Sequence, residues 1–382
     1  MSQSGSAQSN GSPPPLLFPG NDSRKLTAAV LICTILLVTS GCSSSPSMGC
    51  AVTLATAPAQ VMTGATAVYN AFGIVVNAGG QLLSIYRAGI GHVGDKGDLV
   101  LRTSLDGTSW TSPVVLFSDP VYDLRNVAGG MLPSGTIVIF WNRWDLVAQH
   151  SAGVFFSRSV DRGLSWSTPV PIDGRDNAYG PIVALESSSG IALSNPFSNG
   201  CSVYLHTSSD DGASWKDFLP VASSARPLLH DQEVAIVSVG NGNLLGYARQ
   251  AEMTPLLFLR STDWGQSWKI TNSTITGTST ENWSLASPWV ARVADKGVLW
   301  YAERNTGGIL HAVLFDGNGR LGTDYIPFAA PTNDFGYPSV TALPGESFLV
   351  QFYSRIDSST VPLYQLSGHY SVTCPVAASG LP

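Results

Sequence analysis

Polar side chains that could bind and process an anion recur at the ends of short apolar runs in this sequence. The residues that follow or end such runs are Arg87, Arg143, Arg249, Arg304 and Arg355. Those at the starts of runs are Arg125, Glu233 and Tyr337, and the loop after Arg87 adds His92, Asp95 and Asp98. Guanidinium groups form paired hydrogen bonds with planar anions such as carboxylates. These residue types therefore predict an anion site, provided that the fold brings the run ends together.

One eight-residue pattern, S-x-D-x-G-x-S-W, occurs three times. The copies are Ser159–Trp166, Ser208–Trp215 and Ser261–Trp268, and Ser104–Trp110 is a shortened copy. In a tight turn the aspartate carboxylate accepts backbone N–H bonds and the glycine adopts a positive φ. The tryptophan then packs as a large apolar anchor between neighbouring sheets. We therefore interpret these segments, called Asp boxes below, as structural turns without catalytic aspartates.

The Asp boxes repeat about every 50 residues, a period typical of β-propeller units. The same step leads from Asp263 to Asp316, and then to the final apolar run Gly368–Thr373. Each unit contains short runs in which apolar and polar residues alternate or apolar residues are continuous, as in strands. No unit has helical periodicity. The sequence predicts an all-β fold over residues 60–382: a six-bladed β-propeller of four-stranded antiparallel blades with Asp-box turns.

Strand direction alternates within each blade of such a propeller. If an Asp box joins the third and fourth strands, it marks one face of the fold. The starts of the first strands and the ends of the second strands then lie on the opposite face. The polar residues named above occupy those positions, so we expect them to converge on one rim. Charged residues at solvated strand ends would give a similar pattern.

The first fifty residues predict an export signal. Residues 1–41 contain a Ser/Gly/Pro/Asn-rich leader, two basic residues and the apolar run Leu26–Val38. This run is too short to span a hydrocarbon core of about 30 Å. Small residues and Cys42 follow it, as in a bacterial lipoprotein signal. Residues 42–59 would form an anchor linker and a closing strand. The protein would be exported and lipid-anchored at the bacterial cell envelope; ordinary cleavage nearby would secrete it.

Loss of the signal and lipidation of Cys42 would leave three cysteines for disulfides: Cys50, Cys201 and Cys374. An exported protein meets an oxidising compartment, where disulfides persist. The strand that begins at Cys50 should complete the last blade beside the run that ends before Cys374, so we favour a disulfide between these two residues. No cysteine or histidine spacing predicts a metal site, and no cofactor is expected.

Composition excludes several other classes of protein. The chain has 20 Lys and Arg against 26 Asp and Glu, a formal net charge of −6 and only 12% charged residues. Because no basic cluster could follow a phosphate backbone, we expect no nucleic-acid partner. The 10 Trp, 12 Tyr and 14 Phe can bury too much surface for most of the chain to be disordered.

Four Asp boxes on a propeller with an arginine-lined rim resemble the sialidase (neuraminidase) superfamily, and the resemblance covers residues 60–373. The segment from Glu233 to Arg249 is similar to the one that carries the family's glutamate and second arginine. Arg304 stands where the third arginine is expected. Phe335–Ser339 is similar to the family's tyrosine-nucleophile segment.

The resemblance implies a role for each matching residue. Tyr337, activated by Glu233, would be the nucleophile, since a neutral group avoids repulsion by the carboxylate of a sugar acid. Arg249 and Arg304 would bind that carboxylate. Asp95 lies where the family has its aspartate general acid/base. Apolar walls for the sugar would come from Trp144, Trp283 and Phe197.

One segment departs from the family pattern. The family's first arginine lies in an Arg-Ile-Pro segment that opens the first blade, and here that place reads Tyr69–Gly73, without arginine. Either Arg87 or Arg125 reaches the same space, or the third guanidinium is missing. A related acidic or neutral sugar is then a candidate substrate beside sialic acid. His92 is a candidate to replace the aspartate in proton transfer.

Three functions follow from these observations. The first is an exported exo-glycosidase of sialidase type that removes terminal sialic acid or a related acidic sugar from glycans. The second is a non-catalytic glycan-binding propeller lipoprotein. The third is a structural surface protein that uses the propeller as a scaffold. Structural interpretations also exist for single residues: Glu233 as the ion-pair partner of Arg249, Tyr337 as a packing residue, His92 as a loop residue and Asp95 as part of a tight turn.

Overall fold

The computed structural model describes residues 50–63, 69–172, 177–184, 190–195, 203–221, 233–250, 255–277, 284–294, 296–305 and 307–374. The chain divides into two units, Met1–Ser47 and Met48–Pro382, and all described residues belong to the second. Three residues with predicted roles lie outside the described ranges: Cys42, Trp283 and Phe197.

The described residues form β-strands and no helix. Runs rich in Val, Ile, Phe and Trp favour strands because these side chains pack well on a pleated surface. The strand Ile137–Asp145, for example, reads IVIFWNRWD, and its first six residues are buried. Such nearly continuous burial is expected for a strand covered on both faces, as in a sheet that packs between two others.

The strands form antiparallel sheets that follow one another along the chain. The first contains β3 (Tyr69–Asn77), β4 (Leu82–Gly89), β5 (Asp98–Ser104) and β6 (Val114–Phe117). The second contains β7 (Tyr122–Met131), β8 (Ile137–Asp145), β9 (His150–Ser159) and β10 (Val170–Ile172). The third contains β11 (Asn177–Ala178), β12 (Val183–Ala184), β13 (Gly190–Asn195), β14 (Tyr204–Ser208) and β15 (Lys216–Pro220).

The remaining sheets continue the same order. The fourth contains β16 (Val234–Gly240), β17 (Asn243–Ala248), β18 (Leu257–Ser261) and β19 (Lys269–Asn272). The fifth contains β20 (Leu285–Val293), β21 (Lys296–Arg304), β22 (Gly308–Phe315) and β23 (Leu321–Ala330). The last contains β24 (Phe335–Leu343), β25 (Ser347–Ser354), β26 (Leu363–Thr373), β1 (Ala51–Thr56) and β2 (Gln60–Val61).

The prediction of six four-stranded blades is wrong. Five sheets contain the regular order of four strands, and the last of these gains β2 as a fifth strand paired with β26. The third sheet departs from the pattern within the described residues, because two pieces of two residues each, β11 and β12, pair with β13 in place of one inner strand. The sequence repeat located the Asp box of the third sheet, but it could not reveal that the inner strand of this sheet is interrupted.

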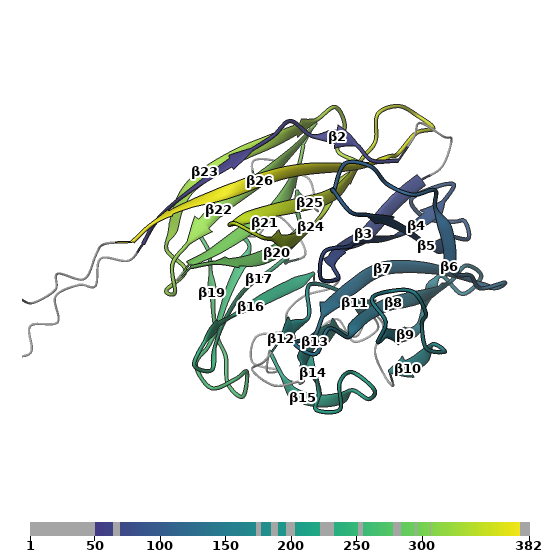
Figure 1. Ribbon diagram of the computed structural model, residues 1–382, viewed down its shortest axis with the longest axis horizontal. Coiled ribbons are helices and arrows are strands. Elements are labelled where there is room, and N and C mark those ends of the chain that lie inside the picture. Colours follow the sequence, from purple (N-terminus) through teal and green to yellow (C-terminus); the bar gives the residue numbers. More distant parts are fainter. Residues whose placement is uncertain are drawn as a thin grey trace, which may run out of the picture. The chain divides into compact units, whose positions relative to one another are not determined.

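The first strands of the sheets lie around a common centre (Figure 1). Contacts run from β3 to β7, from β7 to β11, from β12 to β16, and on through β20 and β24 back to β3. The fold is therefore a closed all-β propeller, and the inner strands bring residues that are far apart in the sequence to one hub.

The Asp boxes form turns between third and fourth strands, as predicted. In the box between β9 and β10, the Asp161 carboxylate accepts hydrogen bonds from Ser165 N (2.9 Å) and Ser159 Oγ (2.8 Å). Gly163 has φ 89°. Hydrogen bonds from the Ser165 and Ser159 side chains, with that from Ser165 N, lower the pKa of the Asp161 carboxyl to about 2. This carboxylate is fully engaged in the turn, which supports its structural role.

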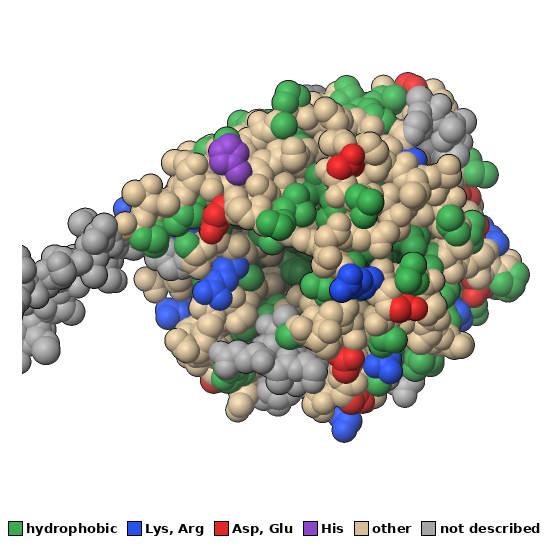
Figure 2. Space-filling view, viewed as in Figure 1, with side chains coloured by type: hydrophobic (Ala, Val, Ile, Leu, Met, Phe, Trp, Pro, Cys, Tyr) green, Lys and Arg blue, Asp and Glu red, His purple; other side chains and the backbone are tan. Residues whose placement is uncertain are grey.

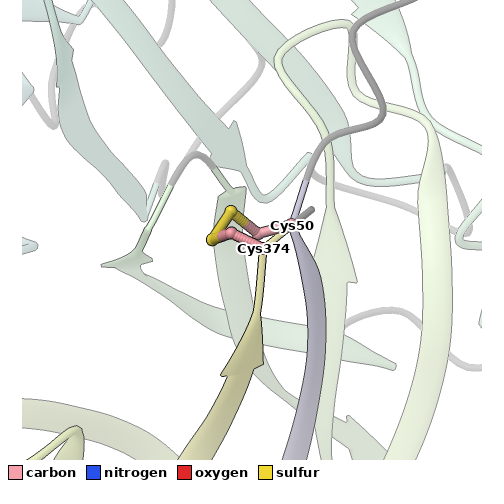
Figure 3. Close-up of a disulfide and its surroundings, with 2 residues drawn as sticks. All are labelled: Cys50 and Cys374. Carbon is pink, nitrogen blue, oxygen red and sulfur yellow. A yellow bond between two sulfur atoms is a disulfide. The ribbon is translucent and has the colours of Figure 1, made fainter. Parts of the chain in front are cut away.

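The propeller closes where the N-terminal strand β1 pairs with β26. Val52 lies opposite Val372, and the flanking Cys50 and Cys374 are joined by a disulfide with their Cα atoms 4.1 Å apart (Figure 3). These cysteines are 324 residues apart. A crosslink over so long a loop removes much of the conformational entropy of the unfolded chain, and typical disulfides stabilise by about 2–4 kcal/mol.

Candidate active site

Four inner strands carry a β-bulge. The register of each strand with its neighbour shifts between Ala71 and Ile74 in β3, Arg125 and Ala128 in β7, Ala286 and Trp289 in β20, and Gly336 and Ser339 in β24. A non-glycine residue with positive φ lies in each bulge: Phe72 (55°), Asn126 (53°), Ser287 (50°) and Tyr337 (54°). Such residues cost backbone energy and cluster at functional sites, where bulges re-aim side chains.

Two of the bulges hold Tyr337 next to the carboxylate of Glu233. The backbone N–H of Ser287 donates to Glu233 Oε2 (2.5 Å), while Ser287 Oγ accepts from the backbone N–H of Tyr337 (2.9 Å). Arg249 Nη1 lies 3.0 Å from Glu233 Oε1, and both side chains are buried. The glutamate is thus fixed from two sides beside the tyrosine.

The hydroxyl of Tyr337 is neutral at ordinary pH. Burial raises the pKa of Tyr337 well above its usual value, and the neighbouring Glu233 carboxylate and its hydrogen bond with the tyrosine raise it further. Arg249 and Arg304 oppose this effect through their positive charges. A neutral hydroxyl hydrogen-bonded to a buried carboxylate is a nucleophile with its base in place.

Arg304 reaches the same region from the end of β21. Its Nε donates to the carbonyl oxygen of Phe335 (2.7 Å), and its Nη2 donates to the hydroxyl of Tyr353 (3.3 Å). Burial alone would lower the pKa of Arg304, but the nearby Tyr353 and Glu233 hold it above the ordinary value. The guanidinium therefore stays charged, and its contacts with Phe335 and Tyr353 fix its orientation.

Arg125 also belongs to the hub. Its guanidinium lies 5.1 Å from the centroid of the Phe72 ring and 5.9 Å from that of Trp144. It interacts electrostatically with Tyr337, as do Arg249 and Arg304. Phe72 occupies the segment where an arginine would be expected, and its ring contacts that of Tyr337 edge-on (4.8 Å between centroids). The structure therefore places three arginines near Tyr337: Arg125, Arg249 and Arg304.

Arg87 lies in a different environment from Arg125. Its side chain is fully buried, and its Nε donates to Asp123 Oδ1 (2.7 Å). Its Nη1 and Nη2 bond to the carbonyl oxygens of Gly91 (2.9 Å) and Asp95 (3.2 Å). Arg87 thus anchors the 90–97 loop to the next blade. The structure does not place its guanidinium beside Tyr337.

Asp95 is held in the same loop. Its Oδ1 accepts hydrogen bonds from Gly91 N (2.9 Å) and Arg87 Nη2 (3.2 Å), and its Oδ2 accepts one from Ile90 N (2.5 Å). Each carboxylate oxygen therefore organises the loop. This geometry gives Asp95 a local structural task, with no described contact to Tyr337 or Glu233.

His92, at the tip of that loop, joins a cluster that the sequence did not reveal. The Tyr69 hydroxyl donates to Asp334 Oδ1 (2.6 Å) and lies 2.6 Å from His92 Nδ1. His92 Nδ1 is 3.3 Å from the same Asp334 oxygen. Arg355 Nε and Nη2 each lie 2.8 Å from Asp334 Oδ2. The only sequence signal that could have indicated Asp334 as a site residue is its position three residues before Tyr337.

The two remaining rim arginines take other partners. Arg355 belongs to the Asp334 cluster just described, and Arg143 lies 3.5 Å from Asp119 and 3.7 Å above the ring centroid of Phe155. Tyr353 and Tyr179 border Tyr337, with ring centroids 6.0 and 5.6 Å from it, and Tyr179 was not singled out from the sequence. Aromatic rings thus surround the nucleophile candidate.

Figure 2 shows a face of the unit that is hollowed near its middle, with hydrophobic side chains in the hollow and basic side chains near its edge. Within the described ranges, no group of three His, Cys, Asp or Glu residues could hold a metal ion. The same ranges contain no helix with the length and apolar character needed to cross a membrane.

Comparisons with known proteins agree with this architecture. A solved structure from Dyadobacter fermentans, of unknown function, has a TM-score of 0.71 and 19% identity, covering 83% of this chain and 99% of that one. A Trypanosoma rangeli sialidase in complex with sialic acid has a TM-score of 0.57 and 14% identity, covering 82% of this chain and 58% of the other. A Hadza microbial sialidase has a TM-score of 0.59 and 16% identity, with coverages of 78% and 65%.

The chain therefore spans less than two thirds of the length of either sialidase. At these identities the likenesses show a shared fold. No curated protein matches the chain. A family model described as a BNR repeat-like domain matches residues 80–344. Since this match covers most of the sequence, the chain belongs to the BNR repeat-like domain family and has the propeller fold of the sialidases.

Proposed function

We propose that this protein is a retaining exo-glycosidase of sialidase type, which hydrolyses a terminal acidic sugar from glycans. One observation carries the proposal: a half-buried tyrosine, in hydrogen-bond contact with a buried glutamate, meets three arginines at the hub. The tyrosine–glutamate pair is Tyr337 with Glu233, and the arginines are Arg125, Arg249 and Arg304.

The chemistry follows from these positions. Glu233 takes the proton of the Tyr337 hydroxyl as the oxygen attacks the anomeric carbon, and a covalent glycosyl-enzyme forms. Water then releases the sugar with retained configuration. A carboxylate nucleophile at this place would be repelled by a sugar acid, whereas a neutral tyrosine is not. Because the reaction uses no redox or Lewis-acid step, no cofactor enters the proposal.

Charge at the hub supports an acidic substrate. The guanidinium of Arg249 pairs with Glu233, and Arg125 lies 3.6 Å from Asp123. Arg304 instead donates hydrogen bonds to two neutral groups, the Phe335 carbonyl and the Tyr353 hydroxyl. Arg304 can therefore supply the charge that a substrate carboxylate would neutralise, in a paired hydrogen bond.

The experiment compares hydrolysis of 4-methylumbelliferyl glycosides of sialic acid, glucuronic acid and galactose. We expect turnover of an acidic glycoside and not of the galactoside. In Arg304→Met, kcat/KM for the acidic substrate should fall about 10- to 100-fold, the value of a hydrogen bond between charged groups. Arg260→Met, which alters an exposed arginine bonded to Asn318, is the matched control. Equal turnover of the neutral glycoside would contradict the substrate assignment.

A glycan-binding protein without catalysis is the second candidate. It is favoured by Phe72 in the place of the first arginine and by Asp95, whose carboxylate oxygens are engaged in its own loop. Binding of sialylated glycans to the wild-type protein, with no release of sugar from any acidic substrate, would favour this candidate over the glycosidase.

We also propose export and lipid attachment at Cys42. The small residues before this cysteine and the short apolar run support it. In a bacterial host, the wild-type protein should incorporate labelled palmitate and enter the detergent phase on partitioning, while Cys42→Ser should do neither. Equal labelling of both proteins, or labelling of neither, would contradict lipid attachment at this residue.

A further inference from the structure

The cluster formed by Tyr69, His92 and Asp334 connects segments from opposite ends of the propeller chain. Tyr69 opens β3, His92 lies in the loop between β4 and β5, and Asp334 precedes β24. All three meet through Asp334 Oδ1 and the Tyr69 hydroxyl, at 2.6–3.3 Å. A carboxylate that bonds one ring nitrogen of a histidine fixes the ring orientation and favours its protonated form.

His92 is both held and accessible. Its side chain is 41% exposed, while that of Asp334 is 19% exposed. The described contacts to its ring nitrogens all involve Nδ1. Nε2 is therefore the nitrogen that can face a ligand. An imidazole fixed at one nitrogen and open at the other has the geometry of a general acid/base.

His92 lies at the same hub as the nucleophile candidate. The Phe72 ring contacts both, with centroids 5.1 Å from His92 and 4.8 Å from Tyr337. Arg125 and Arg304, which face Tyr337, also interact electrostatically with His92. A sugar lying against Phe72 would therefore meet Tyr337 on one side and His92 on another.

We infer that His92 is the acid/base of the reaction and that Asp334 is its positioning residue, in place of an aspartate acid/base. This inference rests on the proposed glycosidase function. Asp95 cannot serve without giving up the backbone bonds that shape its loop. That loop in turn carries His92, so Asp95 contributes by positioning the histidine.

The reaction then has two steps. First, Tyr337 Oη bonds to the anomeric carbon while the bond from that carbon to the leaving oxygen breaks; Glu233 receives the tyrosine proton, and protonated His92 gives its Nε2 proton to the leaving oxygen. Second, neutral His92 takes a proton from water as the water oxygen bonds to the anomeric carbon. The bond to Tyr337 breaks, and the tyrosine oxygen regains its proton from Glu233.

The test compares substrates that need an acid with one that does not. Wild-type and His92→Ala are assayed with sialyllactose and with 2,4-dinitrophenyl sialoside, whose leaving group departs without protonation. We expect kcat/KM of His92→Ala to fall about 10²- to 10⁴-fold on sialyllactose and less than about 10-fold on the activated substrate. Azide should raise kcat of the variant on the activated substrate and yield a glycosyl azide, because this anion needs no base.

Two further variants separate the roles of the residues. His369→Ala changes an exposed histidine on β26 and should behave as wild type. Asp95→Asn should lower both activities together, since it loosens the loop. Two results would overturn the inference and leave the glycosidase function standing. One is a loss of kcat/KM in Asp95→Asn that is confined to sialyllactose. The other is an equal loss of kcat/KM on both substrates in His92→Ala. If the wild type turned over neither these sialosides nor the glucuronide, both proposals would fall.

The pH profile tests the positioning role. Tyr69, Asp334, Arg125 and Arg304 surround His92, and Arg355 pairs with Asp334. Partial desolvation of the half-buried His92 side chain lowers its pKa, and Asp334 opposes this by favouring the imidazolium. Because the acid must be protonated, activity falls as pH rises through this pKa. In Asp334→Asn the alkaline limb of kcat/KM should move to lower pH, by about one unit or more. An unchanged limb would contradict the positioning role.

Discussion

Tyr337→Phe is expected to lower kcat for an acidic aryl glycoside by at least about 10³-fold, the scale of losing a group that acts with its base as a unit. The substitution removes only the hydroxyl. The ring keeps its packing against Phe72 and Tyr179, whose centroids lie 4.8 and 5.6 Å away. The fold should therefore survive, and the loss should report on chemistry alone.

Other tyrosines at the hub make this prediction specific. Tyr69 is bonded to Asp334, and Tyr353 is bonded to Arg304. Tyr179 is buried near Glu233, but the hydrogen bond to the Glu233 carboxylate comes from Tyr337. Tyr179→Phe should consequently retain far more activity than Tyr337→Phe.

The measurement combines steady-state kinetics with mass spectrometry of the enzyme trapped by a slow fluorinated substrate. The added mass should lie on the peptide that contains Tyr337 and should be absent from Tyr337→Phe. Tyr364→Phe, a change on β26 outside the hub, is the control and should leave kcat unchanged. Label on another tyrosine, or wild-type turnover by Tyr337→Phe, would remove Tyr337 from the mechanism.

The parts of the fold that could be predicted are those with local causes. An Asp box is specified by its own eight residues, because Asp161 bonds to Ser159 and Ser165 within the turn. Its spacing then indicated a propeller. The interruption between β11 and β12 has no comparable local signal, since it depends on how β13 finds its partners. The number of regular blades was therefore predicted wrongly.

The candidate site, too, could be predicted only in part. The sequence indicated Glu233, Arg249, Arg304 and Tyr337 because they end or open strands in a recognisable order. The structure places these four residues together. Where a side chain turns after its strand ends depends on its tertiary partners, however. Arg87 turns to Asp123 on the next blade and is buried. The contact of His92 with Asp334, 242 residues away, forms only when the propeller closes.

The ion pair between Arg87 and Asp123 leads to the largest expected effect on stability. Both side chains are fully buried. Asp123 Oδ1 lies 2.7 Å from Arg87 Nε, and its Oδ2 lies 3.6 Å from Arg125 Nε. A Cβ built on Gly89 would come within 2.5 Å of Arg87 Nη1, so the guanidinium packs closely against this glycine.

Asp123→Leu should lower the free energy of unfolding by up to about 3–5 kcal/mol, because it removes the nearest carboxylate from the buried Arg87 guanidinium and leaves only the Asp95 carboxylate at 3.2 Å. The double variant Arg87→Met/Asp123→Leu should lose less than the single variant, because neither charge then needs a partner. Urea unfolding measures both. Lys96→Met, in an exposed pair with Asp98 at 3.7 Å, is the control and should cost no more than about 1 kcal/mol.

The same variants connect stability with the site, because Asp123 also lies beside Arg125. In Asp123→Leu the Arg125 guanidinium loses that carboxylate while keeping its place over Phe72. A freer cation beside Tyr337 should bind a sugar acid more tightly, so KM for an acidic glycoside should fall in the fraction that stays folded. If the double variant were as unstable as Asp123→Leu, the loss would come from packing and not from a stranded charge. Arg87 would then have to be regarded as a space-filling residue of the first blade.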